Sequence, residues 1–169
     1  MQPRLPYSID RDDSRVQWVL LAYRLPREPS TPRIAVWRKL KRLGAAQLLD
    51  GLVALPLDSR TREQLEWLAD EVAEAGGEAT IWIGELGSAA QERELAARMR
   101  EAVAGEYRAV TKEAEQLEVQ PPGRRRRSLA RLRRELRRIR SRDHFPPPER
   151  EQAQQAVDKL ASALEEAAA

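Results

Sequence analysis

The chain has no cysteine and only one histidine among its 169 residues. Without cysteine, the protein has no disulfide, no thiolate metal site and no cysteine nucleophile. One histidine also excludes a multi-histidine metal site. The longest hydrophobic run, residues 18–23, is far too short to span a bilayer, and residues 1–13 hold no apolar segment of the kind a signal peptide needs. We therefore expect a cytoplasmic protein with no cofactor.

Sequence signatures of catalysis are missing as well. There is no glycine-rich phosphate loop and no pair of carboxylates at the end of an expected strand. His144 stands beside Asp143 in a turn bounded by prolines, and no serine or threonine motif points to it as a base. We interpret His144 as structural and predict that the chain is not an enzyme.

The net charge of +3 conceals a strong asymmetry along the chain. Residues 124–142 hold eleven arginines and one glutamate, a local charge of +10, whereas the rest of the chain carries a charge of −7. Such a division is typical of an acidic or neutral body with one element that faces a polyanion.

Strand and helix signals alternate over residues 14–86, which we predict to form one α+β domain. A strand apolar on both faces is expected at 15–25, and a helix follows, with Thr31 as N-cap and Gly44 at its end. The Asp50-Gly51 pair predicts a hairpin between residues 46–49 and 52–55. A second helix begins at Asp58 or Ser59 and ends at residues 76–77, before a strand at 78–84. The order β-α-β-β-α-β predicts a ferredoxin-like domain, with two helices on one face of a four-stranded antiparallel sheet.

The second half of the chain is predicted to be helical. A connecting helix is expected over residues 88–118, and an arginine-rich helical hairpin over 124–167. Apolar residues recur at helical spacing on both arms of the hairpin, and residues 146–148, all proline, form the turn between the arms. The apolar residues are Leu129, Leu132, Leu136 and Ile139 on the first arm, and Ala153, Val157, Leu160 and Leu164 on the second.

Arginines occupy the surface of the first arm opposite its leucine seam, along about 28 Å of helix. Those expected on the outer face are Arg127, Arg131, Arg134, Arg138 and Arg142, with Arg133, Arg137 and Arg140 beside the seam. Like charges at helical spacing repel, so this face needs a polyanion or acidic partners. We predict that it binds nucleic acid phosphates. The alternatives are a solvated face and pairing with the carboxylates of the last helix, Glu149, Glu151, Asp158, Glu165 and Glu166.

Two further sets of residues have competing interpretations. The basic residues Arg33, Arg38, Lys39, Lys41 and Arg42 fit an ordinary solvated helix face, with phosphate contact as the alternative. The tryptophans Trp18, Trp37, Trp67 and Trp82 lie on apolar stripes, so we predict that they belong to the core or to an interface. Base stacking by Trp82 on an open sheet face is the alternative.

Several segments resemble the N-terminal region of the chromate-resistance regulator ChrB. They are residues 18–26 (WVLLAYRLP), 33–45 (RIAVWRKLKRLGA), 61–67, 76–79 and the block from Leu132 to Phe145. The resemblance extends over residues 14–164. It implies a transcriptional regulator linked to chromate transport, in which basic residues serve DNA binding and chromate-dependent control. The matching positions are Arg38, Arg42, Arg133 and Arg134.

The same element order also resembles the CRISPR-associated small nuclease and the middle domain of the phenylacetate repressor. That nuclease family has a metal-binding aspartate near the end of the first strand, where this chain has Tyr23-Arg24-Leu25 and no carboxylate. Fold resemblance alone does not establish function. A metal-dependent nuclease therefore ranks last among the three hypotheses, below a protein-interaction module that pairs with a separate effector domain.

The leading hypothesis is a DNA-binding transcriptional regulator. Its expected partners are double-stranded DNA, a second copy of the chain and a separate effector domain, with chromate as a candidate effector and no membrane contact. The candidate nucleic-acid-binding residues are Arg38, Arg42, Arg127, Arg131, Arg133, Arg134, Arg138 and Arg142.

Overall fold

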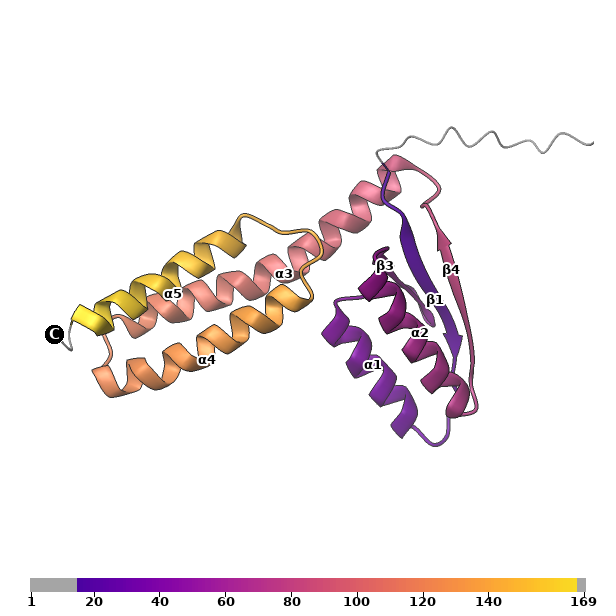
Figure 1. The fold of residues 1–169 in the computed structure, drawn as a ribbon, viewed down its shortest axis with the longest axis horizontal. Coiled ribbons are helices and arrows are strands. Elements are labelled where there is room, and N and C mark those ends of the chain that lie inside the picture. The colour runs from indigo at the N-terminus through magenta and orange to yellow at the C-terminus, as the bar shows by residue number, and fades with distance from the viewer. Residues whose placement is uncertain (1–14, 167–169) are drawn as a thin grey trace, which may run out of the picture.

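A computed structural model of the chain, which describes residues 15–166, has a sheet with two helices at one end and three long helices at the other (Figure 1). The elements in order are β1 (Trp18–Arg24), α1 (Thr31–Leu43), β2 (Ala46–Leu49), β3 (Leu52–Pro56), α2 (Ser59–Glu74), β4 (Glu78–Gly84), α3 (Ala89–Leu117), α4 (Pro122–Ser141) and α5 (Glu149–Glu166). The predicted α+β class is confirmed. The expected domain bounds stay a prediction, and their outermost residues, 14 and 167, lie outside the described part.

The four strands form one antiparallel sheet in the order β2-β3-β1-β4. β1 is central and buries side chains on both faces, as its two-sided apolar pattern predicts. Val19 and Leu21 pack with the buried residues of α1 and α2, whereas Trp18 belongs to a separate cluster on the other face. The sheet therefore has apolar contacts on both sides.

Local sequence signals account for most of the element ends. Gly44 ends α1 with φ +70°, a left-handed conformation that favours glycine. Asp58 caps α2 by accepting a hydrogen bond from the Thr61 backbone N–H at 2.7 Å, and the Thr61 hydroxyl accepts one from the Asp58 N–H. The prediction of Thr31 as the N-cap of α1 is wrong, because the cap is Ser30 and the helix already includes Thr31. Pro32 is accommodated in the first turn, where its missing N–H costs no hydrogen bond.

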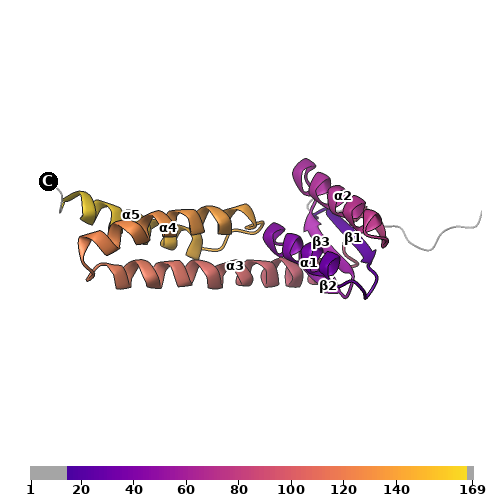
Figure 2. The ribbon, with the colours of Figure 1, turned by 90° about the horizontal axis from the view of Figure 1, so that it is seen from below.

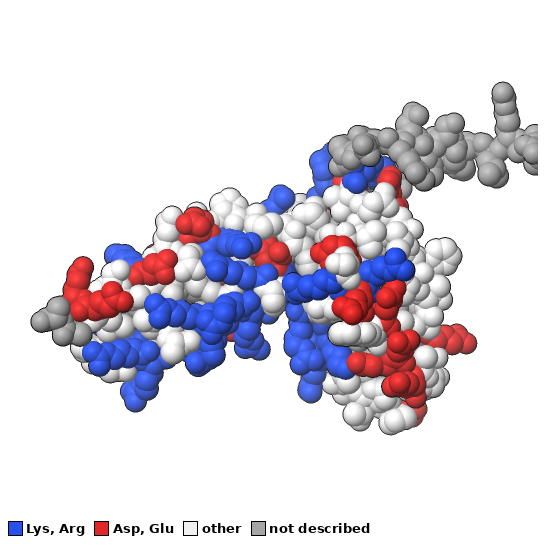
Figure 3. All heavy atoms as spheres, viewed as in Figure 1, with Lys and Arg blue, Asp and Glu red and all other residues white. Residues whose placement is uncertain are grey.

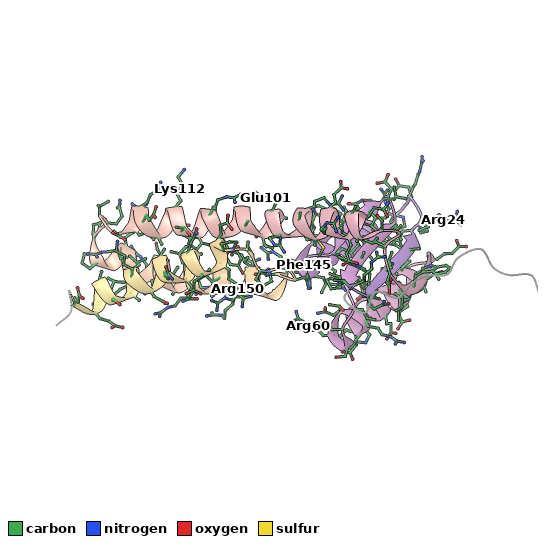
Figure 4. All side chains as sticks on the ribbon, turned by 90° about the horizontal axis from the view of Figure 1, so that it is seen from above. Arg24, Arg60, Glu101, Lys112, Phe145 and Arg150 are labelled. Carbon is green, nitrogen blue, oxygen red and sulfur yellow. The ribbon has the colours of Figure 1, made fainter. Side chains whose placement is uncertain are left out.

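The sheet face opposite α1 and α2 is partly covered by the chain itself. Leu95 of α3 packs with Trp18 and Ala54 there, and Phe145 joins them from the segment after α4. The rings of Trp18 and Phe145 are 5.9 Å apart between centroids. Figure 4 shows Phe145 where the helices meet the sheet. These contacts attach the helices to the sheet domain.

The three long helices form a bundle around one apolar core (Figure 2). The predicted seams of α4 and α5 face each other in this core, and α3 adds a third apolar side. The buried residues of α3 are Val103, Tyr107, Val110, Ala114 and Leu117. The two arms of the expected hairpin are thus two helices of a three-helix bundle. Across residues 15–166, none of the helices has the length and apolarity required to traverse a bilayer.

Only one of the four tryptophans lies in the core. Trp18 is fully buried, but Trp37, Trp67 and Trp82 are 52%, 58% and 61% exposed. For these three the prediction of a core position is wrong, and an interface position stays untested. The reason is geometric for Trp37, because Val36 and Leu40 already form the buried stripe of α1.

Candidate nucleic-acid interface

Helix α4 has the orientation that its sequence predicts. Leu132, Leu136 and Ile139 are buried in the bundle, and nine of the eleven arginines of residues 124–142 are exposed. Lys and Arg side chains gather over α4 and over the adjacent part of the sheet domain, where α1 lies (Figure 3). We call the exposed Lys and Arg residues of α1 and α4 the basic face.

The arginines nearest α3 pair with carboxylates. At 100° per residue, Arg131, Arg138 and the C-cap residue Arg142 lie within about 40° of one another, and we call them the carboxylate flank. Arg131 pairs with Glu113 of α3, Arg138 with Glu135 at 3.3 Å, and Arg142 with Glu106 of α3. The carboxylate flank is therefore largely neutralised from within the chain.

The partners of this flank are not the ones considered from the sequence. Within residues 15–166, no arginine of α4 forms an ion pair with a carboxylate of α5, so the alternative of pairing with the last helix is wrong. Glu149 instead contacts Arg108 of α3 at 3.0 Å, and Asp158 accepts a hydrogen bond from Gln154 of its own helix at 2.8 Å. The α4 side chain that does reach α5, Arg140, donates to the neutral amide oxygen of Gln154 at 2.6 Å. The carboxylates that neutralise part of the arginine charge of α4 therefore come from α3 and from α4 itself, and not from α5.

The other flank of α4 carries free cations. Arg126, Arg133 and Arg137 also lie within about 40° of one another, and we call them the open flank. All three are exposed, as are Arg127 and Arg134 on the outermost strip. Within residues 15–166, none of these five side chains makes a hydrogen bond or ion pair. Such guanidinium groups are available to phosphates.

The structure thus divides the predicted residues of α4 into two groups. Arg127, Arg133 and Arg134 remain uncompensated, whereas Arg131, Arg138 and Arg142 face carboxylates. Sequence reasoning left Arg126 and Arg137 out of the candidate set, although their offset of about 100–140° from Leu132 marks them as solvent-facing.

Arg142 also has a structural role at the junction between the sheet domain and the three-helix bundle. Its side chain is only 18% exposed, and Nε donates to Glu106 at 3.1 Å. The hydrogen bond to Glu106 raises the pKa of Arg142 further, so this side chain stays charged. A Cβ added at Gly44 would lie 2.5 Å from the carbonyl oxygen of Arg142, so the end of α1 directly abuts this residue.

Two further contacts join helices of the sheet domain to the end of α4 and the segment after it: one involves α1 and the other α2. Nε2 of His144 lies 2.8 Å from the carbonyl oxygen of Leu43, and Arg60 donates to the carbonyl oxygen of Ser141 at 3.0 Å. The C-terminal ends of α1 and α4 therefore lie side by side.

This packing places the two basic segments next to each other. Arg38 and Arg42 of α1 are exposed and form no ion pair with any residue that the structure describes, whereas Lys39 turns to Glu71 of α2. The basic face is thus built from two segments that are about 90 residues apart in the sequence. Over residues 15–166, no three histidine or acidic side chains are grouped so that they could hold a metal ion.

Comparison with known proteins places the chain in a family. The family model described as "Protein ChrB, N-terminal" matches residues 33–121, which is more than half of the chain. A curated relative, Protein ChrB of Cupriavidus metallidurans, is 36% identical over 77 residues, which are 46% of this chain and 23% of the relative. The match thus spans less than a quarter of the relative's length.

The region matched by the family model is shorter than the resemblance seen in the residues. It contains Arg38 and Arg42 but ends before α4, so it does not include the arginines of α4. The match extends from α1 through α3, so it includes three of the four strands and the longest helix of the bundle, but not β1. The chain belongs to the ChrB N-terminal family.

Proposed function

We propose that the chain is a DNA-binding transcriptional regulator of the chromate-resistance type, which works by binding and not by catalysis. The observation that carries this proposal is the set of uncompensated arginines on α4, next to Arg38 and Arg42 on α1. Membership in the ChrB N-terminal family supports the regulatory part of the proposal. Chromate-dependent control follows from the resemblance alone.

The dimensions of the basic face suit a nucleic acid backbone. Helix α4 has 20 residues and is about 30 Å long, and phosphates along one DNA strand follow at intervals of several ångströms. The five exposed arginines of α4 that make neither a hydrogen bond nor an ion pair, together with Arg38 and Arg42 of α1, give on the order of five to seven phosphate contacts. Contacts of this kind position a protein on DNA and carry little sequence information. We therefore expect strong salt dependence with a modest sequence preference.

The sheet domain fits the same proposal. From its element order and its strand order β2-β3-β1-β4, we infer that the sheet domain has a ferredoxin-like fold. In this arrangement α1 covers one face of the sheet, and the side chains on its solvent-facing side can contact a ligand. The homodimer and the separate effector domain stay predictions.

Gel-shift titrations at several salt concentrations test the proposal. The duplex DNA is taken from the region upstream of the gene that encodes the chain. We expect log affinity to fall linearly with log salt, at a slope near −5 for about six phosphate contacts. Chromate added to the complex would change the affinity if chromate is the effector. Failure to bind any duplex at low salt would refute the proposed function.

A further inference from the structure

A pocket lies between the N-terminal half of α1 and the β2–β3 turn, away from α4. Its volume is about 620 Å³, within the range of small-molecule sites. The residues that matter for its chemistry are Tyr23, Arg27, Arg33, Trp37, Ile34 and Asp50. Arg24, on its rim, is labelled in Figure 4 at the end of the sheet domain distant from the bundle. This site is separate from the open flank of α4.

One wall of the pocket is fixed by backbone contacts. The backbone N–H of Tyr23 donates to the carbonyl oxygen of Gly51 at 2.7 Å. Gly51 has φ +77°, and a Cβ added there would lie 2.3 Å from the carbonyl oxygen of Tyr23. Only glycine allows the turn to approach β1 this closely. The Asp50-Gly51 turn therefore holds Asp50 in a defined place at the pocket wall.

The polar side of the pocket carries positive charge. Arg27 and Arg33 are exposed and have no hydrogen bond or ion pair to the residues of the described range, whereas Arg24 pairs with Glu78 at 2.7 Å. Asp50 is the acidic residue among those lining the pocket. Two free guanidinium groups beside one carboxylate favour an anionic ligand that also offers a hydrogen-bond donor.

The other side of the pocket is aromatic and apolar. Trp37 is 52% exposed and Ile34 is 45% exposed, so both present a surface that a planar ring can cover. The ammonium group of Lys41 lies 5.6 Å from the centroid of the Trp37 ring and adds positive charge there. Burial and the charge of Asp50 raise the pKa of Tyr23, so its hydroxyl stays protonated and able to donate.

From this arrangement we propose that the pocket binds a nucleoside phosphate. The base stacks on Trp37 and Ile34, the phosphate is held by Arg27 and Arg33, and Asp50 accepts a hydrogen bond from the base or the sugar. A bare oxyanion would leave the aromatic wall without a contact, and an uncharged ring would leave both guanidinium groups without an acceptor. The ligand is either a free mononucleotide or one nucleotide of a single strand.

Binding measurements on the whole chain separate these sources. Isothermal titration with ATP, AMP, inorganic phosphate and a short single-stranded oligonucleotide would be combined with the variants Arg33→Gln and Trp37→Leu. Arg100→Gln, an exposed arginine of α3 outside both the pocket and the basic face, and Trp67→Leu, an exposed tryptophan of α2, are matched controls. We expect each pocket variant to weaken binding of ATP or of the oligonucleotide about tenfold, and the controls to change it less than about twofold.

Each outcome decides for or against the site. Binding of ATP that depends on Arg33 and Trp37 supports a free nucleotide, and binding of the oligonucleotide alone with the same dependence supports a single strand. Inorganic phosphate binding as tightly as ATP, pocket variants that behave like their controls, or no binding of any probe would overturn the proposal. Loss of duplex DNA binding in variants of α4 tests the proposed function and not the pocket. Failure of the pocket proposal can therefore be distinguished from failure of the proposed function.

Discussion

The division of α4 into two flanks leads to a quantitative prediction for DNA binding. We consider a triple variant of the open flank, in which Arg126, Arg133 and Arg137 become glutamine. Glutamine has nearly the helix propensity of arginine, and all three side chains are exposed, so α4 keeps its seam and its place in the bundle. The substitution thus removes three uncompensated charges and little else.

The expected loss follows from counterion release. Each phosphate contact contributes about 0.9 to the slope of log affinity against log salt. At 0.1 M salt one contact is then worth about eightfold in affinity, and three contacts about 500-fold. The triple variant should therefore bind duplex DNA about 500-fold more weakly at this salt concentration, with a slope less steep by about 2.7. Fluorescence anisotropy across a salt series measures both quantities.

Two control proteins separate local contact from general charge. The first changes Arg93, Arg100 and Lys112 to glutamine, which removes the same charge from exposed positions of α3. The second changes Arg131 and Glu113 together to glutamine and removes a neutral pair from the carboxylate flank. We expect the first to lose less than about tenfold and the second almost nothing, with slopes near that of the parent. A loss in the α3 variant equal to that of the open flank would refute the assignment of DNA contact to α4.

Three further predictions concern the framework that supports this face. Asp58→Ala should lower the free energy of unfolding by about 1 kcal/mol, because it removes the cap of α2, and Asp58→Asn should retain the cap; urea denaturation compares them. The hydrogen bond from the Thr61 N–H lowers the pKa of Asp58, so the cap's contribution is present above the pKa of the unfolded chain and is lost as pH falls through the lower, folded value; the Asn variant should lack this dependence. Tyr107→Phe should cost about 1.5–3 kcal/mol in the same assay, since the tyrosine hydroxyl donates to the buried Asp143 carboxylate at 2.9 Å, and an unchanged midpoint would contradict this role. Gly44→Ala should destabilise by more than 1 kcal/mol because of the positive φ and the contact with Arg142, and hydrogen exchange should show faster opening at the α1 C-terminus; equal stability would mean that the junction relaxes freely.

The elements themselves could be predicted from the sequence because their signals are local. The two-sided apolar run of β1, the Asp50-Gly51 turn and the cap at Asp58 each depend on neighbours within a few residues. The leucine seam of α4 likewise follows from spacing alone, and with it the outward direction of the arginines. These features determined the α+β class and the location of the largest positive charge.

The tertiary structure determines which of these positive charges are compensated by carboxylates. Glu106 and Glu113 reach Arg142 and Arg131 only because α3 packs beside α4, and no spacing along the chain signals this approach. The pocket beside Trp37 likewise requires the β2–β3 turn to lie near α1. Amphipathic patterns tell which face of an element is buried, because that choice depends on the side chains of the element itself. Which cations stay free depends on the side chains of its neighbours, and those are set only when the helices pack.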